Sequence, residues 1–364
     1  MIIFHVAEVI KGGVASVINE LLREQSTDTD IKKVTCLIPD SQREELIADD
    51  DLLYTFKRTG RNIISLFRFF LKFVSILVRE KPDIIHLHST FAGFVCRFVL
   101  LLFPFVKVKV IYCPHAFSFM MKKNRAKVKI YAVVEQILSI KTNAIICVSN
   151  YERDKAIEVG LNKDKLKTIY NGVSEPSKSL IERPGCSELN VLYVGRFDFQ
   201  KGFDILLDII KLSAPNKGIS FTIIGDFVSE NESYSIASEN AKFLGWLPKQ
   251  EIYKYYRSSD VLLIPSRWEG LAMVPLEAFS CKLPVIASSC SSFPEIIDDH
   301  VNGFLVDMEQ REDVVNLLLR LSTAEGKDKL KDMSTNAYET YHEKFSAEKM
   351  TLCVKKLYSS IYND

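Results

Sequence analysis

Residues 190–202, NVLYVGRFDFQKG, decide the fold of the region around them. The first five residues form a largely apolar, valine-containing run that is typical of a buried strand. The next eight hold two glycines, two bases and an aspartate, which is typical of a turn, and residues 203–211 have the apolar spacing of a helix. A strand, a short turn and a helix in this order predict one unit of a parallel α/β sheet.

The same alternation of strand-like runs and helical patterns continues over the whole chain. It favours parallel sheets that helices cover on both faces. The predicted strands are residues 2–6, 33–38, 84–87, 109–112, 144–148 and 167–170 in a first series, and residues 190–194, 220–224, 261–264, 284–287 and 303–306 in a second series.

Proline, glycine and serine concentrate in residues 174–187, between the two series, and predict an interdomain linker. We therefore expect two Rossmann-like, doubly wound α/β domains, residues 1–175 and 188–345, that face each other across a cleft. Binding loops in such domains follow the carboxyl ends of the strands. Ser346 has the character of an N-cap, and the helix that follows, residues 346–364, is expected to pack back on the first domain.

Composition narrows the class of protein. The 364 residues are 47% hydrophobic and carry a formal net charge of +1, so no nucleic-acid partner is expected. Eight cysteines without a CxxC pair indicate buried free thiols in a reducing compartment. The longest apolar stretch, residues 91–106, is too short and too interrupted to span a membrane. We expect a cytoplasmic protein that can attach peripherally to the inner face of the cell membrane.

The turn at residues 195–202 has the chemistry of a diphosphate site. Arg196 and Lys201 bracket the turn, and the helix that follows presents free N–H groups and partial positive charge at its start. The alternative is a solvated turn with two surface bases.

A second motif, residues 266–278 (SRWEGLAMVPLEA), follows the predicted strand 261–264. Glu269 lies in the predicted loop, and Glu277 lies in a helix that Pro275 is expected to open. A carboxylate there can accept two hydroxyls of a ribose or a hexose, each hydrogen bond contributing roughly 1.5–3 kcal/mol. Alternatively, Glu277 only complements the helix dipole.

Taken together, the two motifs resemble the family-4 retaining glycosyltransferases, which have the GT-B fold. The resemblance covers essentially the whole chain and is strongest over residues 171–307. It is carried by residues 195–202, by Glu269 and Glu277 with seven residues between them, and by Asn171-Gly172-Val173, Pro284-Val285-Ile286-Ala287, Pro294-Glu295 and Asn302-Gly303-Phe304-Leu305-Val306.

The resemblance implies a role for each matching position. Arg196 and Lys201 would bind the donor diphosphate and stabilise the leaving nucleotide, Glu277 would hold the ribose hydroxyls, and Glu269 would touch the transferred sugar. The remaining donor-binding positions would be Gly195, Gly270, Leu271, Ala272 and Met273. With these carboxylates engaged in hydroxyl binding, no obvious nucleophile remains, and the resemblance implies front-face substitution.

Two features of the first domain match the family. Gly12 and Gly13 follow the first predicted strand and would let the backbone approach the donor phosphate or the acceptor. His115 follows the strand 109–112, and the resemblance implies that it points at the donor sugar. The alternatives are a plain tight turn for the glycines and a packed or surface histidine for His115. His86 and His88 are interpreted as local structure that lines the cleft.

Two further stretches concern the nucleobase and a metal. Residues 225–229, GDFVS, stand where the family often has a glycine-rich run, which leaves the nucleobase contact open. Asp28-Thr29-Asp30 resembles the metal-binding pair of other glycosyltransferases, but its polar surroundings predict a solvated loop. Since Arg196 and Lys201 supply positive charge, we expect neither a metal nor a cofactor.

Basic residues in the first domain suggest an acceptor or membrane side. Arg68 and Lys72 belong to a basic stripe on an otherwise apolar predicted helix, residues 61–81, which could rest on anionic lipid or be a buried helix with a thin solvated face. Lys122, Lys123 and Arg125 follow His115 and could meet a lipid-linked diphosphate acceptor.

The expected function is that of a retaining hexosyltransferase. Its donor would be a UDP- or GDP-sugar, and its acceptor a saccharide, lipid-linked, in the synthesis of a cell-surface polysaccharide. A non-hydrolysing nucleotide-sugar epimerase and a non-catalytic nucleotide-sugar-binding protein remain alternatives. A dinucleotide-dependent enzyme is disfavoured because no complete GxGxxG follows the first strand.

Overall fold

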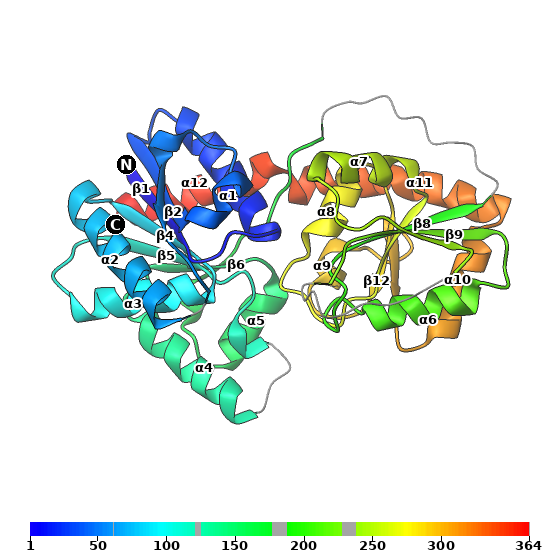
Figure 1. Ribbon diagram of the computed structural model, residues 1–364, viewed down its shortest axis with the longest axis horizontal. Coiled ribbons are helices and arrows are strands. Elements are labelled where there is room, and N and C mark those ends of the chain that lie inside the picture. The colour runs from blue at the N-terminus through cyan, green and yellow to red at the C-terminus, as the bar shows by residue number, and fades with distance from the viewer. Residues whose placement is uncertain (61, 121–124, 177–187, 228–237, 364) are drawn as a thin grey trace. The chain divides into compact units, whose positions relative to one another are not determined.

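The computed structural model describes residues 1–60, 62–120, 125–176, 188–227 and 238–363. The chain forms two compact units (Figure 1). The first unit comprises Met1–Gly172 together with Ala347–Asp364, and the second unit comprises Val173–Ser346. Each unit is built on its own parallel sheet, so the predicted fold class of two Rossmann-like α/β sheets is confirmed.

The sheet of the first unit has the strand order β3-β2-β1-β4-β5-β6-β7, and all its neighbours are parallel. Its order reverses between β1 and β4, which is where doubly wound sheets bind ligands. The strands are β1 Ile2–Ala7, β2 Lys33–Pro39, β3 Leu53–Phe56, β4 Ile84–His88, β5 Lys109–Cys113, β6 Ala144–Cys147 and β7 Leu166–Thr168. The helices are α1 Gly13–Thr27, α2 Ile63–Glu80, α3 Thr90–Leu102, α4 Arg125–Ser139, α5 Asn150–Glu158 and α12 Ala347–Asn363.

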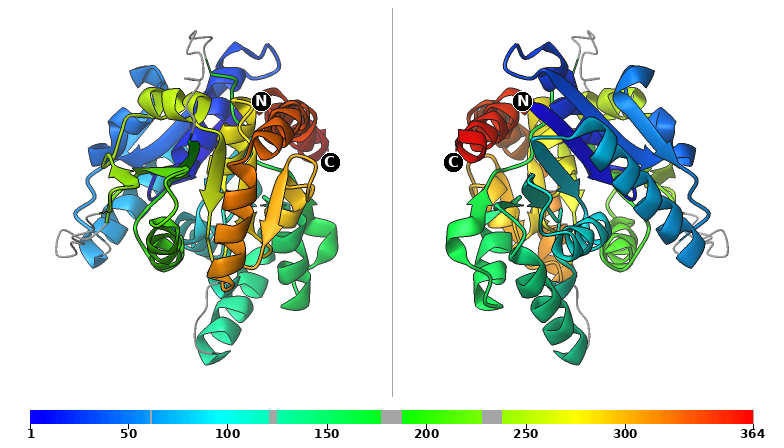
Figure 2. Two further views of the ribbon diagram at one scale, coloured as in Figure 1. Left: turned by 90° about the vertical axis from the view of Figure 1, so that its right-hand side faces the viewer. Right: turned by 90° about the vertical axis from the view of Figure 1, so that its left-hand side faces the viewer.

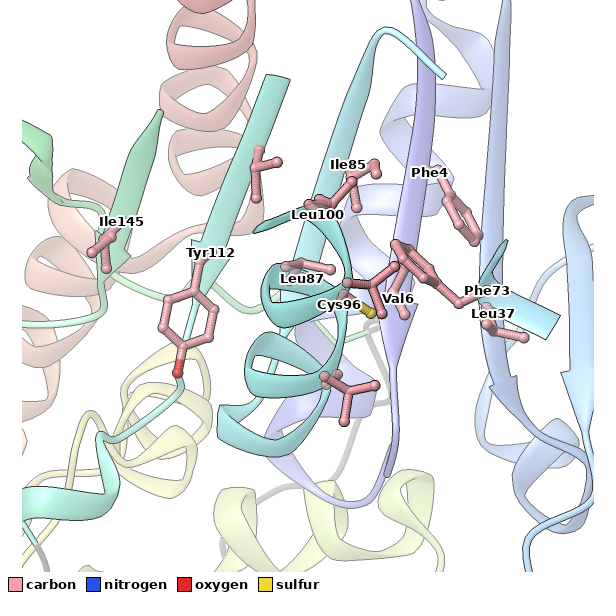
Figure 3. Close-up of a cluster of buried hydrophobic side chains, with 14 of the residues drawn as sticks. Phe4, Val6, Leu37, Phe73, Ile85, Leu87, Cys96, Leu100, Tyr112 and Ile145 are labelled. Carbon is pink, nitrogen blue, oxygen red and sulfur yellow. The ribbon is translucent and has the colours of Figure 1, made fainter. Parts of the chain in front are cut away.

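One face of this sheet carries an apolar core (Figure 3). Because side chains alternate along a strand, Phe4 and Val6 of β1 point to this face. They meet Phe73 of α2 and Cys96 of α3, all of them buried. Helices α2, α3 and α4 all contribute to this cluster and therefore cover the same face.

The C-terminal helix α12 packs in the first unit, next to α1. Tyr358 of α12 lies 2.6 Å from the Nδ1 atom of His86, and Lys355 bridges Asp28 at 2.8 Å and Asp30 at 3.1 Å. The predicted solvated loop is confirmed at the exposed Thr29 and Asp30, whereas the Asp28 side chain is only 7% exposed, lies beneath this ammonium group and helps to hold α12 in place.

The second unit has the strand order β10-β9-β8-β11-β12-β13, again all parallel. Its order reverses between β8 and β11, which are neighbours in the sheet. The strands are β8 Leu189–Val194, β9 Ile219–Ile224, β10 Ala241–Phe243, β11 Val261–Ile264, β12 Val285–Ser288 and β13 Gly303–Val306. The helices are α6 Phe203–Ser213, α7 Lys249–Ser258, α8 Met273–Ser280, α9 Phe293–Ile296, α10 Arg311–Leu321 and α11 Ala324–Thr340.

The adjacency of β8 and β11 positions the predicted donor motifs. Residues 195–202 follow β8 and residues 265–272 follow β11. Because neighbouring parallel strands end at the same edge of a sheet, these two loops emerge side by side at the switch point. Figure 2 shows this unit from its end, with the β8 and β11 strands running through its middle.

Candidate active site

Two glycines allow the loops after the central strands to approach each other closely. Gly202 has a φ of 66°, and a Cβ atom on it would lie 2.0 Å from the carbonyl oxygen of Pro265. Gly225, after β9, has a φ of 140°, and its Cβ would lie 1.8 Å from the carbonyl oxygen of Gly195. Both positions need glycine for backbone conformation and for space. They hold the three loops at the switch point in contact.

Asp198 organises the loop after β8 from within. Its carboxylate accepts a hydrogen bond from the backbone N–H of Lys201 at 2.8 Å and pairs with the Arg196 guanidinium at 3.1 Å. Gln200 accepts from Arg196 at 3.2 Å and donates to the carbonyl oxygen of Trp268 at 3.2 Å. The loop after β8 is thereby fixed to the loop after β11. The sequence motif predicted Arg196 and Lys201 as site residues. It did not predict that Asp198 and Gln200 would hold the loop after β8 in place.

Lys201 and Glu269 form an ion pair across the two loops. The ammonium nitrogen lies 2.6 Å from Oε1 of Glu269, a residue that is only 7% exposed. The resemblance implied separate tasks for these residues, with Lys201 on the diphosphate and Glu269 on the sugar. In the structure, the carboxylate holds the ammonium group at the switch point. An arriving diphosphate would compete with Glu269 for this cation.

The Glu277 carboxylate is held by two side chains of α7. The buried Tyr256 donates to Oε2 at 3.0 Å, and Lys249 pairs with Oε1 at 3.1 Å. Burial, reinforced by the neighbouring Glu277, keeps the pKa of Tyr256 well above its ordinary value, so the phenol remains a donor. Neither Lys249 nor Tyr256 was predicted from the sequence as a partner of Glu277. The two residues lie seven positions apart on one helix and therefore on one face, and this spacing could have identified them.

Helix α8 begins at Met273, two residues before Pro275, so the expected helix start at Pro275 is wrong. Glu277 is thus the fifth helical residue. A helix dipole acts mainly on charges in the first turn of the helix. The alternative that Glu277 only complements the dipole is therefore disfavoured. The N–H groups of Met273 and Val274 lie in that first turn and have no helical carbonyl partner. Gly270, Leu271 and Ala272 lead into them and are buried.

Removing the Tyr256 hydroxyl is expected to weaken donor binding. Tyr256→Phe keeps the packing of α7 but leaves Oε2 of Glu277 without its buried donor, so the carboxylate is less well positioned. We expect donor Kd to rise roughly five- to tenfold, about 1–1.4 kcal/mol, because the lost hydrogen bond acts on the donor only through the position of Glu277, with kcat nearly unchanged. Titration calorimetry with the donor measures this. Tyr255→Phe on the same helix is the matched control, and an unchanged Kd in Tyr256→Phe would contradict the role of the phenol.

In the first unit, Gly12 and Gly13 start α1 directly after the loop that follows β1. Gly12 is the N-cap, with φ 57° and ψ −127°, a conformation that other residues avoid. Nothing lies within 4 Å of an added Cβ, so the backbone alone requires glycine here. No side chain caps this helix start, which leaves its first amides available to an anion.

His115 lies on a strained loop that Glu152 supports. His115 and Ala116 have φ values of 53° and 109°. The buried Glu152 carboxylate accepts from the backbone N–H groups of Ala116, Phe117 and Val148, at 3.0, 3.2 and 2.7 Å. Burial raises the pKa of Glu152 to about 7, although these amides oppose the shift. Ser149 and Glu152 have the three-residue spacing of a capping box, and this spacing could have identified Glu152 from the sequence.

His115 also ends a chain of buried histidines. Its Nε2 atom lies 3.1 Å from His88 Nδ1, His88 Nε2 lies 2.9 Å from His5 Nδ1, and His5 Nε2 lies 2.7 Å from Gln25 Oε1. Burial lowers the pKa of His5 and of His115 to about 4, and it also holds the pKa values of His86 and His88 well below their ordinary value. These rings are therefore neutral at pH 7, and His88 orients the ring of His115.

Among the residues that the structure describes, His5, His86 and His88 form a group with the spacing of metal ligands, each with a ring nitrogen within 4.8 Å of the others. They belong to the sheet of the first unit. His5 is bonded to His88 and to Gln25, and His86 Nδ1 is bonded to Tyr358, whereas the buried Nε2 atom of His86 has no hydrogen-bond partner among the described residues. In the second unit, the donor loops offer Arg196 and Lys201 as cations.

The predicted site residues thus fall into three groups. Arg196, Lys201, Glu269 and the residues from Gly270 to Glu277 meet at the switch point of the second unit. Gly12, Gly13 and His115 follow strands of the first unit. Arg68 and Lys72 lie on α2 and Arg125 starts α4, whereas Lys122 and Lys123 lie outside the described residues.

Two doubly wound parallel sheets, with paired cations and carboxylates in the loops after the central strands of one, define the GT-B class of glycosyltransferases. Comparison with models of protein families supports this class. Residues 11–175 match "Glycosyltransferase Family 4", and residues 186–340 match "Glycosyl transferases group 1". The chain belongs to glycosyltransferase family 4.

Two curated relatives and a solved structure extend the comparison. An uncharacterised 41.2 kDa protein in the cps region of Klebsiella pneumoniae is 42% identical over 87% of this chain and 89% of its own length. The Escherichia coli UDP-Gal:alpha-D-GlcNAc-diphosphoundecaprenol alpha-1,3-galactosyltransferase is 28% identical over 85% of this chain and 84% of its own length. Anabaena HepE in complex with UDP-glucose superposes with a TM-score of 0.76 at 17% identity, over 99% of this chain and all of the other.

Proposed function

We propose that this glycosyltransferase is a retaining hexosyltransferase that takes its sugar from a nucleotide-sugar, UDP-linked or GDP-linked. The observation that carries the proposal is the group of Arg196, Lys201 and Glu269 at the switch point of the second unit. Two cations fixed beside a helix N-terminus suit a diphosphate. Anabaena HepE, whose structure contains UDP-glucose, and the E. coli relative, whose name specifies UDP-Gal, support a UDP-sugar.

In the proposed reaction, the bond between the anomeric carbon and the diphosphate oxygen breaks, and a bond to the acceptor oxygen forms on the same face of the sugar. The acceptor proton passes to the departing phosphate. Negative charge grows on the diphosphate, where Arg196 and Lys201 stabilise it. Lys201 holds Glu269, and Lys249 and Tyr256 hold Glu277, so neither carboxylate is placed in the structure as a free nucleophile.

The acceptor is proposed to be a lipid-linked saccharide diphosphate in the synthesis of a cell-surface polysaccharide. The E. coli galactosyltransferase names a diphosphoundecaprenol-linked acceptor, and the Klebsiella relative is described from a cps region. Arg125 at the start of α4 is the described member of the basic cluster assigned to this acceptor. We propose that the enzyme works at the inner face of the cell membrane. Among the described residues, no helix combines the length and apolarity needed to cross a bilayer.

A donor panel tests the nucleotide assignment. At a concentration about 100-fold above Kd, the correct nucleotide-sugar is expected to stabilise the folded state by ~2.7 kcal/mol, a rise of a few degrees in Tm. UDP-sugars, GDP-sugars and the free nucleotides are compared by thermal unfolding. Arg196→Ala is the control, because it removes a diphosphate cation from the half-exposed surface and should suppress the rise. The absence of a shift with every nucleotide-sugar would contradict the donor site.

Product analysis then tests the reaction. A retaining transferase gives an α-linked product from an α-linked donor, which proton NMR reads from the anomeric coupling. An epimerase would convert the sugar nucleotide in the absence of acceptor, and a non-catalytic protein would bind it without turnover. Inverted product would contradict the proposed stereochemistry while leaving the donor site in place.

A further inference from the structure

Helix α3 exposes large apolar side chains along one stripe. Phe94, Phe98 and Leu102 are 41%, 49% and 59% exposed and recur every four residues. Phe103 and Phe105 continue the exposed stretch beyond the helix, the second of them 75% exposed. Four-residue spacing puts side chains on the same helix face, so α3 shows solvent an apolar ridge.

Helices α2 and α4 show the same property. On α4, the exposed apolar residues recur at intervals of three and four, which is again one face. On α2, they share the outer face with Arg68. The exposed apolar residues are Ile130, Val133, Ile137 and, just past the helix, Ile140 for α4, and Ile63, Ile64, Phe67, Leu71 and Val78 for α2.

The three helices form one continuous surface. All of them pack on the same face of the first sheet, and α3 contacts both α2 and α4. Arg97 of α3 is bonded to Glu135 of α4 at 2.8 Å, and Lys141 reaches the carbonyl oxygen of Pro104 at 3.2 Å. In Figure 1, α2, α3 and α4 follow one another along one side of this unit. A soluble monomer rarely exposes so large an apolar patch unless something binds it.

Burial of the one charged residue within α3 keeps this ridge uncharged. Arg97 is fully buried, with its guanidinium 3.7 Å from the centre of the Tyr112 ring and its charge paired with Glu135. The charge on α3 thus lies beneath the exposed face, in contact with α4 and β5.

The exposed charges on and between these three helices have one sign. Residues 62–120 and 125–141, all described, contain only three acids, Glu80, Asp83 and Glu135, and none of them is exposed. The exposed bases of the same ranges are Arg68, Arg79, Lys81, Lys107, Arg125, Lys127 and Lys129. An apolar surface with bases and without exposed acids complements the acyl chains and phosphates of an anionic bilayer.

We propose that the outer face of α2, α3 and α4, here called the lipid face, lies on an anionic membrane. The apolar tips of Phe94, Phe98, Leu102, Ile130, Val133 and Ile137 enter the boundary between headgroups and acyl chains, and the bases contact lipid phosphates. The sequence pointed to the bases of α2 and to Lys122, Lys123 and Arg125, whereas the exposed apolar residues of α3 and α4 emerge only from the structure. The inference rests on the proposed function solely in placing a lipid-linked acceptor at the same membrane.

Vesicle flotation tests the lipid face directly. The wild-type chain is expected to float with phosphatidylcholine vesicles that contain phosphatidylglycerol, and to float less at high salt. Phe98→Glu combined with Ile137→Glu adds two acids to the ridge, and we expect the bound fraction to fall roughly tenfold or more. Leu212→Glu combined with Trp246→Glu, at exposed apolar sites of the second unit, is the matched control and should bind like wild type.

The readouts separate this inference from the proposed reaction. Flotation needs no nucleotide-sugar, so an inactive enzyme would still bind vesicles. The Phe98→Glu, Ile137→Glu variant should keep its Tm and its turnover of a water-soluble acceptor. Wild-type protein that does not float with the phosphatidylglycerol-containing vesicles at low salt would overturn the lipid face. So would a dimer, detected by light scattering, that the same variant dissociates, because a second copy would then cover the surface.

Discussion

Replacing Lys201 with alanine is expected to lower kcat for glycosyl transfer by about 10²–10³, the cost of losing one charge-stabilising group in a transition state. Two effects act in the same direction. The diphosphate loses a cation, and the buried Glu269 carboxylate loses the partner that lies 2.6 Å away and then repels the phosphates. Steady-state transfer assays with the donor and acceptor measure the change.

The fold should survive this substitution, since Lys201 is partly exposed and the glycine required at position 202 is kept. Thermal unfolding of the free enzyme checks this point. Lys211→Ala, which removes an exposed lysine from α6, is the control and should transfer at the wild-type rate. Turnover near that of wild type in Lys201→Ala, with donor saturating, would refute the assignment of the active site.

Mild acid is expected to destabilise the first unit. The pKa of His5 is about 4 when the chain is folded, against an ordinary value near 6.5, and His86, His88 and His115 are shifted in the same direction. The unfolded chain therefore binds more protons below pH 6.5, and stability that is fully present above this pH is lost as the pH falls toward 4. Between pH 7 and 5.5, each buried histidine costs roughly 1 kcal/mol.

Protonation of Glu152 changes the stability of the folded chain in the opposite direction. Its pKa is raised to about 7 in the folded chain, so the folded state takes up a proton as the pH falls from 7, which offsets roughly one histidine. The net loss between pH 7 and 5.5 is then roughly 2–3 kcal/mol. Denaturant unfolding at the two pH values measures it. His88→Gln should reduce the pH dependence and His300→Gln, at an exposed site, should not; equal stability at both pH values would contradict neutral buried histidines.

The sequence by itself predicted the elements and the local chemistry. Each of the eleven strands expected from apolar runs occurs in the structure, because a short β-branched run with turn residues at both ends leaves few alternatives. The missed strands, β3 and β10, are short and lie at sheet edges, where the apolar signal is weak. Arg196, Lys201 and Glu277 could be named because turn and helix spacing are local properties.

The tertiary structure decided which of these residues meet. Glu269 is 68 positions from Lys201, and only the pairing of β8 with β11 brings the two charges to 2.6 Å. Tyr256 supports Glu277 from another helix, and Glu152 supports the His115 loop from beyond β6. No periodicity encodes such contacts, because they depend on the order of strands in the sheet.

The same distinction between local pattern and tertiary packing applies to the helices of the first unit. The apolar pattern of residues 61–81 predicted α2 as a helix, yet it could not say how much of a helix the sheet would cover. Packing buries Arg97 beside Glu135 and leaves Phe98 and Ile137 outside. The sheet buries one side of each helix, and neighbouring helices bury its flanks. Apolar residues that lie outside these buried areas remain exposed. Sequence therefore determined the strand-turn-helix units and their charged loops. Tertiary packing determined the ion pairs of the donor site and the apolar surface of α2–α4, because both depend on contacts between distant segments.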